Sequence, residues 1–489
     1  MDVSEFLPLM MFAALAVLLF SGYPVAFVLG GIGLTFGFIG MAMGEFHFTL
    51  FGIIPSRVFG GIAESLILTA IPMFIFMGTM LEKSGAARDL LNCLQVLLRK
   101  VPGGLALSVT LMGTIMAATT GIIGASVVMM TLLSLPVMLD RKYDIPLATG
   151  TIAASGTLGI LIPPSIMLVI MADLLGRSVG NLFVAAIFPG LILASFYVIY
   201  IVTRCFFNPK LAPRPESDFG PDTLGGILVM VLRSFIPPIF LIMAVLGSIL
   251  MGFATPTEAA GVGAAGSILL AIFNLVIIPA LGGKPMDFTH NNAADVFDDK
   301  ATGKGVFADL KHFWGVLKEV IERTALTNGM LFGIFIGATL FSFVFRTLGG
   351  DDLVIELVEA LGLGSWGLLF LIMGIVFFLG FFFDWIEITL IVLPVFTPII
   401  ELMDFGSHLE QIDIIYWFAI MLAVNLQTSF LTPPFGFALF YMKAVAPRGV
   451  KIQQIYWGII PFVLIQLTGL ALVMAFPDIA LWLPRMLLD

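Results

Sequence analysis

Four polar interruptions within long apolar runs hold the residues that could bind ions or a small solute. Two of them contain adjacent prolines, Pro163-Pro164 within residues 155–165 and Pro433-Pro434 within residues 425–434. Proline has no backbone N–H and disfavours helix for the preceding residue, so we expect both segments to be unwound. Unwinding frees carbonyl oxygens, which together with hydroxyl groups suit Na⁺, and creates half-helix N-termini that attract carboxylates.

The other two interruptions divide apolar runs near their middle. Thr119–Ser126 divides the run Leu105–Leu139, and Asp384–Thr389 divides the run Ser365–Met403. Each run has about 35–40 residues, which is enough for two short helices that enter and leave on the same side. We therefore predict two re-entrant helical hairpins, each facing one of the unwound segments.

Asp384 and Glu387 are the only acids in the apolar core of the second hairpin. Their spacing places both on one helix face, and acids at membrane depth are candidates for function. Ion coordination, proton relay and capping of the hairpin tip all suit Asp384, because Asp is a common N-cap. Glu387 has no evident capping role, so a functional role is favoured. Glu258, which follows Thr255-Pro256-Thr257, is interpreted as a first-turn acid favoured by the helix dipole.

The candidate binding residues are polar groups, glycines and prolines of these four segments. Neither the hairpin runs nor the proline segments contain Lys or Arg, so helix N-termini and co-transported cations would balance an anionic substrate. The candidates are Thr119, Thr120, Gly124, Ser126, Ser155, Gly156, Thr157, Gly159, Pro163, Pro164, Ser165, Asp384, Glu387, Thr389, Asn425, Gln427, Thr428, Ser429, Thr432, Pro433 and Pro434.

Composition decides which class of protein positions these residues. Of the 489 residues, 60% are hydrophobic and 11% are charged, whereas soluble domains carry about 25% charged residues. The net charge of −9 gives no basic patch for nucleic acid, and Cys93 and Cys205 cannot form a disulfide framework or a multi-thiolate metal site. The apolar runs are too continuous for a β-barrel. We therefore predict an all-α polytopic membrane protein, without the basic N-terminal region of a cleaved signal peptide.

Apolar runs of about 20 residues locate the predicted transmembrane helices. They are Phe6–Phe20, Pro24–Met43, Leu66–Leu81, Pro146–Met171, Leu182–Val202, Phe235–Met251, Glu258–Leu281, Ala325–Phe345, Ile414–Val445 and Tyr456–Phe476. With alternating topology, 19 of the 23 Lys and Arg residues fall on one side, and the other side receives only Arg57, Arg177, Arg346 and Arg485. The positive-inside rule makes the first side cytoplasmic and both termini periplasmic.

Two segments are expected to lie outside the hydrocarbon region. Gly282–Thr324 is charged and contains an amphipathic stretch at Leu310–Ile321. We interpret it as a cytoplasmic linker with one surface helix, and a regulatory or partner-binding module is the alternative. Asp89–Lys100 is amphipathic and is interpreted as an interfacial arm helix.

Three proline motifs recur in the same order in the two halves of the chain. Pro136, Pro163-Pro164 and Pro189 correspond to Pro394, Pro433-Pro434 and Pro461. Basic loops flank the first hairpin, whereas acidic loops flank the second, so equivalent loops should lie on opposite sides of the membrane. Inverted repeats with paired broken helices are typical of secondary transporters.

Several motifs are shared with one transporter family over nearly the whole chain. They are residues 21–27 (SGYPVAF), 156–165 (GTLGILIPPS), 182–190 (LFVAAIFPG), 253–260 (FATPTEAA), 383–385 (FDW) and 425–436 (NLQTSFLTPPFG). With these motifs the chain resembles the large membrane subunit of tripartite ATP-independent periplasmic (TRAP) transporters, in the ion transporter superfamily. The insertion Gly282–Thr324 and Glu387 depart from the general pattern and indicate a subgroup.

The resemblance implies an inverted-repeat, elevator-type importer in the bacterial inner membrane, not an enzyme. It implies a small four-helix membrane subunit and a periplasmic binding protein as partners, and an organic acid whose uptake is driven by co-transported Na⁺, with no organic cofactor. Carried over by motif, the Na⁺ candidates are Ser126, Gly156, Thr157, Asp384, Thr428 and Thr432. C4-dicarboxylates, sialic acid, 2-oxo acids and lactate-type substrates all stay open.

The implied architecture divides the chain into alternating scaffold and transport segments. These are scaffold helices (residues 1–81), an arm helix (82–104), the first hairpin and broken helix (105–208), second-repeat scaffold helices (209–281), the insertion (282–324), a scaffold helix with the second arm (325–364), and the second hairpin, broken helix and C-terminal helix (365–489). Two alternatives remain. One is a stand-alone carrier or antiporter of the same superfamily, and the other is an intramembrane enzyme that uses Asp384 and Glu387.

Overall fold

The computed structural model describes residues 6–19, 21–120, 123–213, 220–221, 223–281, 305–433 and 436–488. Within these ranges every regular element is a helix. Seven helices are long and apolar enough to cross a membrane, and α12 (Leu224–Ser234) with α13 (Ile236–Leu250), which meet at 41°, would together make an eighth. The prediction of an all-α polytopic membrane protein is therefore confirmed.

Two sets of helices follow the same order along the chain. In each set, a short helix is followed by a helical hairpin, a broken helix and a long helix. The first set comprises α6 (Ala86–Leu97), α7 (Gly104–Thr120), α8 (Ile123–Asp140), α9 (Ile145–Thr157), the 3-10 turn η3 (Leu158–Ile160), α10 (Ile166–Leu174) and α11 (Val179–Phe207). The second comprises α17 (Gly350–Ala360), α18 (Ser365–Leu379), α19 (Trp385–Glu401), α20 (Ile414–Leu431), α21 (Phe437–Val445) and α22 (Ile452–Ala475).

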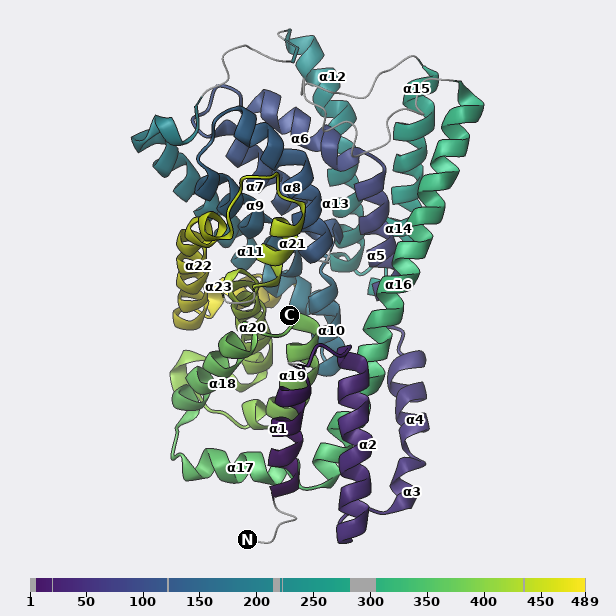
Figure 1. Cartoon of the computed structure of the whole chain (residues 1–489), viewed down its shortest axis with the longest axis vertical. Coiled ribbons are helices and arrows are strands. Elements are labelled where there is room, and N and C mark those ends of the chain that lie inside the picture. The colour runs from purple at the N-terminus through teal and green to yellow at the C-terminus, as the bar shows by residue number, and fades with distance from the viewer. Residues whose placement is uncertain are drawn as a thin grey trace.

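The two sets enter the molecule from opposite ends. Figure 1 shows α6 lying across the upper end and α17 across the lower end, with the α7–α8 and α18–α19 hairpins pointing toward the middle. This arrangement agrees with the inversion that the loop charges predict. We call α7–α11 with α18–α22 the hairpin unit.

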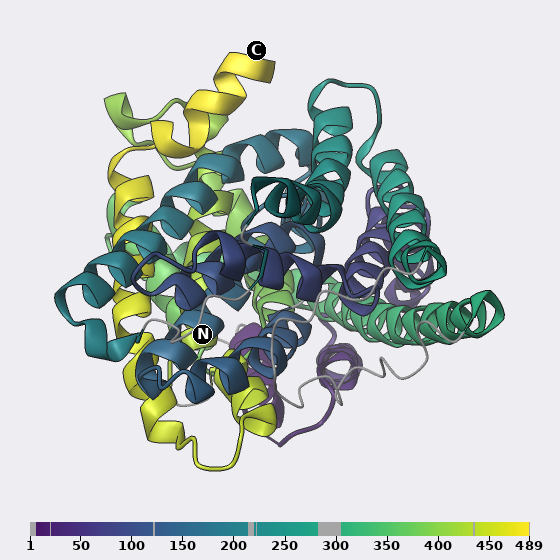
Figure 2. The same ribbon diagram turned by 90° about the horizontal axis from the view of Figure 1, so that it is seen from above.

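The remaining helices lie mainly along one side of the hairpin unit (Figures 1 and 2). These flanking helices are α1 (Leu7–Leu19), α2 (Val25–Met43), α3 (Phe48–Phe51), α4 (Ile54–Val58), the π-helical turn η2 (Phe59–Ala63), α5 (Ala70–Lys83), α13, α14 (Pro256–Ile272), η5 (Phe273–Ile277), α15 (Ile278–Ala280) and α16 (Val306–Thr347). α2 packs against α16, and α5 packs against α14, so each pair draws one helix from each half of the chain. The C-terminal α23 (Asp478–Leu488) packs against α11.

Glycines allow α2 and α16 to approach closely. A Cβ atom at Gly337 would lie 2.5 Å from the carbonyl oxygen of Ala26, and one at Gly33 would lie 2.9 Å from the side chain of Leu340. Small residues at helix contacts are typical of membrane proteins, where close backbone packing replaces hydrophobic exclusion of water. The α2–α16 pair therefore forms a tight wall beside the hairpin unit.

The amphipathic stretch Leu310–Ile321 is not a separate surface helix. It is part of α16, which runs without a break into the predicted span Ala325–Phe345 because no proline interrupts it. Phe313 packs in an apolar cluster with residues of α5 and η5, and Lys83 forms an ion pair with Glu319 at 2.8 Å. This part of the expected linker is therefore fixed on the flanking helices, and residues 282–304 of the insertion lie outside the described residues.

Candidate functional site

The first broken helix is interrupted later than the sequence analysis predicts. α9 remains helical through Ser155 and Gly156 to Thr157, and only residues 158–165 depart from α-helix. The reason is that prolines 163 and 164 lack the N–H groups that would reach the carbonyls four residues earlier, and they leave the preceding turns intact. The Ser165 hydroxyl replaces one missing donor, since its Oγ donates to the Ile160 carbonyl oxygen at 2.5 Å.

The second broken helix also stays helical longer than expected. α20 continues through Asn425 to Leu431, and the break begins at Thr432. The hydroxyls of this stretch bond inside the helix, because Thr428 Oγ1 donates to the Asn425 carbonyl at 2.6 Å and Thr432 Oγ1 donates to the Thr428 carbonyl at 2.6 Å. Unwinding from residues 155 and 425 onward is therefore wrong, although both breaks occur next to the proline pairs.

Each hairpin packs against one broken helix, as predicted. In the first pair, a Cβ at Gly156 would lie 2.5 Å from the Val127 side chain, and Ser155 Oγ donates to Thr110 Oγ1 at 3.3 Å. In the second pair, Asn425 Nδ2 donates to the Met373 carbonyl at 2.8 Å. Gly380, at the end of α18, also lies directly against α20. A Cβ at this position would be 1.9 Å from the side chain of Ser429. Two hairpin–broken-helix pairs therefore form the interior of the hairpin unit.

A buried polar network joins these two pairs at Thr157. Gln427 Nε2 donates to the Thr157 carbonyl at 3.1 Å, and Gln466 Nε2 of α22 lies 3.4 Å from Thr157 Oγ1 and 2.8 Å from the Tyr197 hydroxyl of α11. In the described part of the chain, the Oε1 atoms of Gln427 and Gln466 are buried without a hydrogen-bond donor. Such carbonyl oxygens are available as cation ligands.

Sequence reasoning missed Gln466 and Tyr197. A usable signal was present, because Gln466 is a polar residue in the middle of the predicted span Tyr456–Phe476. Gln466 lies outside the four polar interruptions that the sequence pattern marks. The structure shows that it shares partners with Gln427, which the sequence analysis does include.

Asp384 and Glu387 form a capping box at the start of α19. Asp384 Oδ1 accepts a hydrogen bond from the Trp385 N–H at 2.7 Å, and Glu387 Oε2 accepts one from the Asp384 N–H at 3.1 Å. The expectation that Glu387 lacks a capping role is therefore wrong, because the third residue of a helix can reach back to the N-cap. Thr255 and Glu258 form the same motif at the start of α14, which agrees with the structural interpretation of Glu258.

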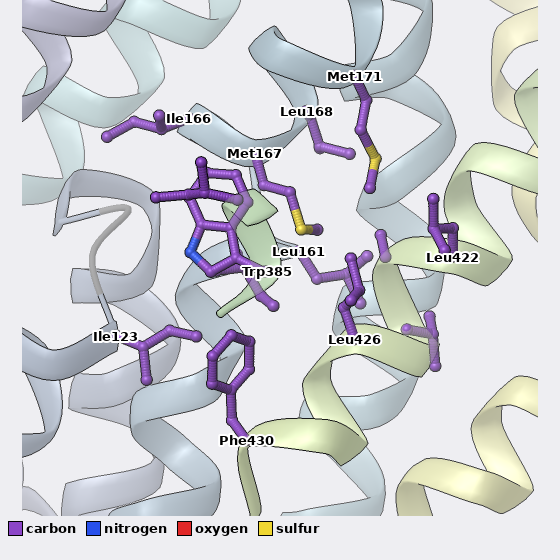
Figure 3. Close-up of a cluster of buried hydrophobic side chains, with 14 of the residues drawn as sticks. Ile123, Leu161, Ile166, Met167, Leu168, Met171, Trp385, Leu422, Leu426 and Phe430 are labelled. Carbon is purple, nitrogen blue, oxygen red and sulfur yellow. The ribbon is translucent and has the colours of Figure 1, made fainter. Parts of the chain in front are cut away.

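An inner cavity of about 90 Å³ lies where the two hairpin tips approach each other. Gly124 of the first tip and Asp384 of the second line it, together with Phe430 at the end of α20, Tyr441 of α21 and Thr327 of α16. Figure 3 shows the apolar part of this region, where the side chains of Ile123, Trp385 and Phe430 converge. The cavity therefore combines one acid and two hydroxyl groups with apolar walls.

Among the described residues, the other candidates are not part of the lining of this cavity. Glu387 and Thr432 are half-buried, and the Thr389 hydroxyl is buried with no partner among the described residues. Fully enclosed are Ser126, Ser155, Gly156, Thr157, Gly159, Pro163, Pro164, Ser165, Asn425, Gln427, Thr428 and Ser429. Pro434 and the side chains of Thr119 and Thr120 lie outside the described residues.

The proposed Na⁺ candidates fall into two groups. Ser126, Gly156 and Thr157 belong to the first hairpin–broken-helix pair, and Asp384, Thr428 and Thr432 belong to the second. Gln427 connects the groups through its hydrogen bond to Thr157. The division matches the two pseudo-equivalent halves of the hairpin unit.

An outer vestibule, which the sequence analysis did not identify as a site, separates the hairpin unit from the flanking helices. Its two adjoining parts measure about 460 Å³ and 610 Å³. Both are lined by η2 and α16 on one side and by α10 and α19 on the other, and α4 adds to the smaller part. The vestibule contains Arg57 and Arg346, two of the few cations on the side predicted to be periplasmic. That minority of arginines was the signal that could have located it.

Comparison with solved structures finds a similar overall fold. The chain is similar to the Alcanivorax borkumensis YdaH transporter, with a TM-score of 0.54 and 14% sequence identity. The similarity covers 90% of this chain and 89% of that chain. At this level of identity the similarity concerns the fold alone.

Comparisons of sequence identify the family. The family model for the tripartite ATP-independent periplasmic transporter, DctM component, matches residues 12–479. The C4-dicarboxylate TRAP transporter large permease protein of Pseudomonas aeruginosa is 31% identical, over 87% of this chain and 88% of its own length. The ectoine TRAP transporter large permease protein of Halomonas elongata is 26% identical, over 97% and 98%. The isethionate TRAP transporter permease protein DctMQ of Oleidesulfovibrio alaskensis is 26% identical, over 86% and 58%. The chain therefore belongs to the DctM family of large membrane subunits of TRAP transporters.

Proposed function

We propose that this subunit carries a small organic anion into the cell together with Na⁺, receiving the anion from a periplasmic binding protein. A small membrane subunit completes the transporter. In the isethionate relative, whose name contains both DctM and Q, this chain corresponds to 58% of a longer polypeptide. The partner can therefore be a separate chain or a fused segment.

The observation that carries the proposal is the pairing of two hairpins with two broken helices around one buried polar network. The breaks remove backbone donors beside the proline pairs, which leaves carbonyl oxygens to be satisfied by other groups. Gln427 and Gln466 add buried amide oxygens without donors among the described residues. Oxygen ligands without a fixed cation nearby suit Na⁺, since a hard cation prefers carbonyl and hydroxyl oxygen.

The names of the relatives and the charge of the candidate site support an anionic substrate. C4-dicarboxylates, ectoine and isethionate all carry a carboxylate or sulfonate group. The hairpin runs and proline segments contain no Lys or Arg. The anionic group would therefore be balanced by helix N-termini and bound Na⁺, which couples the two solutes.

Alternating access would result from movement of the hairpin unit along the flanking helices. The inner cavity already has walls from both parts, because Asp384 and Tyr441 belong to the hairpin unit whereas Thr327 belongs to α16. A relative displacement would carry the hairpin tips past α16 while the Thr157 network keeps the two hairpins together. This is the elevator mechanism that the family resemblance implies.

Reconstitution tests the proposal directly. The subunit and its small partner are reconstituted in proteoliposomes, and a periplasmic binding protein of a TRAP transporter is added outside. Uptake of radiolabelled succinate, ectoine and isethionate is measured with and without an inward Na⁺ gradient. We expect uptake of at least one solute that requires the gradient and the binding protein. Gradient-independent uptake would contradict Na⁺ coupling, and uptake without the binding protein would identify a stand-alone carrier.

A further inference from the structure

The outer vestibule holds one cation, Arg57, that has no acidic partner in the described part of the chain. Arg57 of α4 is exposed and lies over the ring of Phe343, with its guanidinium carbon 4.7 Å from the ring centroid. Among the described residues no Asp or Glu forms an ion pair with it. The aromatic contact orients the guanidinium plane and leaves its N–H donors available.

The second arginine of the vestibule has partners. Arg346 of α16 donates to the Pro394 carbonyl of α19 and lies 3.6 Å from Asp351. The Pro394 carbonyl lacks its usual helical donor, because residue 398 is also proline and has no N–H. Arg346 therefore comes from the same flanking side as Arg57 and reaches α19 on the opposite wall.

The acidic residues on the opposite wall are also engaged. Asp173 of α10 accepts a hydrogen bond from Ser65 Oγ at 2.9 Å, and Glu401 of α19 pairs with Arg177 at 3.1 Å. The arginines that line the vestibule therefore come from the flanking helices, and Asp173 and Glu401 come from the hairpin unit. Arg57 has no counter-ion among the described residues.

The vestibule ends close to the inner cavity. On α16, Leu331 lines the inner cavity and Phe335, one turn later, lines the vestibule. On α19, Ile386 lines the inner cavity and Leu390 lines the vestibule, again one turn later. An anion at Arg57 would therefore stand on the route toward the hairpin tips.

We propose that Arg57, supported by the charge of Arg346, is a capture site for the carboxylate or sulfonate group of the transported solute before it reaches the inner cavity. A guanidinium group binds such anions with two parallel N–H donors, which gives orientation as well as charge. Ser342 of α16 lines the same vestibule and so offers a position for a reporter. This inference rests on the proposed function for the identity of its ligand, but the electrostatic site itself can be tested without transport.

The test uses a single reactive thiol in the vestibule. Cys93 and Cys205 are buried, so Ser342→Cys supplies the reporter, and Ser407→Cys, exposed in the connection between α19 and α20, supplies the control. Labelling rates are compared for an anionic and a cationic methanethiosulfonate reagent of similar size. We expect the anionic-to-cationic rate ratio at residue 342 to exceed the ratio at residue 407, and to fall on the order of fivefold with Arg57→Gln but little with Arg57→Lys.

Succinate should slow labelling at residue 342 and lose this effect in Arg57→Gln. Equal ratios at the two positions, or a ratio unchanged by Arg57→Gln, would overturn the capture site. Protection by phosphatidylglycerol in the bilayer without protection by succinate would also overturn it, since the anion would then be a lipid headgroup.

Uptake gives the second readout. Arg57→Gln should lower uptake at subsaturating substrate about tenfold and recover at high concentration, whereas Arg448→Gln, an exposed cation outside the vestibule, should not change it. Equal uptake by the two variants would overturn the capture role. A charge effect on labelling in a protein that transports none of the solutes would instead reject the proposed function and leave the anion site standing.

Discussion

Gly380 offers a sharp test of the contact between the second hairpin and α20. A Cβ atom at this position would lie 1.9 Å from both the Cβ and the Oγ of Ser429. Its backbone has φ −65° and ψ −11°, which alanine adopts without strain, so the predicted effect of Gly380→Ala comes from the clash alone. Overpacking of this kind costs about 1–3 kcal/mol, and we expect about 2 kcal/mol of lost stability.

Two further variants identify the atoms responsible. Ser429→Gly removes the obstructing Cβ, so the double variant should recover about 1.5 kcal/mol of the loss, as neighbouring residues in a double-mutant cycle do. Ser429→Ala removes only the hydroxyl and keeps the Cβ, so it should recover little. The matched control is Gly374→Ala in the same helix, where a Cβ meets nothing within 4 Å and helix propensity should give up to about 1 kcal/mol of stabilisation.

Thermal unfolding in detergent, followed by circular dichroism, ranks the variants by melting temperature. Na⁺-driven uptake measures whether the loss of stability also lowers transport. Gly380→Ala should melt lowest, and the double variant should melt close to the parent protein. If Gly380→Ala behaves like Gly374→Ala, α18 and α20 do not approach as described. If Ser429→Ala rescues as well as Ser429→Gly, the close contact involves the hydroxyl rather than the backbone spacing of the helices.

Three other predictions concern the polar interior and the arm helix. Asp384→Asn keeps a good N-cap but removes the charge. This variant and Thr432→Ala should each weaken the Na⁺ dependence of uptake without lowering the melting temperature. Unchanged Na⁺ dependence in both variants would refute the placement of the ion. Gln466→Leu leaves the buried Tyr197 hydroxyl without its partner and should cost about 1–3 kcal/mol of stability in chemical unfolding, with Gln453→Leu on the polar start of α22 as a near-neutral comparison. Burial raises the pKa of the Cys93 thiol from 9.0 to about 11. As pH rises, the unfolded chain therefore loses the Cys93 proton before the folded protein does, and the stability of the parent protein should fall between pH 9 and 11. Melting curves across that range should show a smaller fall for Cys93→Ala in α6.

The helical membrane architecture and the repeated order of elements with opposite orientation could be predicted from the sequence, because apolar length and the sign of loop charges act locally. The proline pairs located both helix breaks for the same reason. The extent of unwinding was overestimated, since a proline disturbs only the carbonyls about one turn earlier and Ser155 and Asn425 lie farther away. The capping role of Glu387 was not predicted, although a spacing of three residues from Asp384 fits a capping box. The apolar surroundings of the two acids favoured a functional interpretation instead.

Contacts between distant segments could not be predicted from local patterns. Gln466 and Thr157 are brought together only when α22 packs beside α9, and no feature of either segment specifies the other. The outer vestibule depends on α4, α10, α16 and α19 meeting from four separate parts of the chain. Arg57 and Arg346 are among the four basic residues that the charge count assigns to the periplasmic side. Their position in one vestibule results from tertiary packing.

The proline at position 398 has a consequence for movement. In most helices, a side chain that binds a backbone carbonyl must share it with the helix's own N–H. The Pro394 carbonyl has no such competitor, so Arg346 can leave and return while every remaining hydrogen bond of α19 stays in place. In the proposed movement of the hairpin unit, the contact between α16 and α19 could therefore break and form again, and breaking it would require hydration of one guanidinium and one carbonyl but no unwinding of α19.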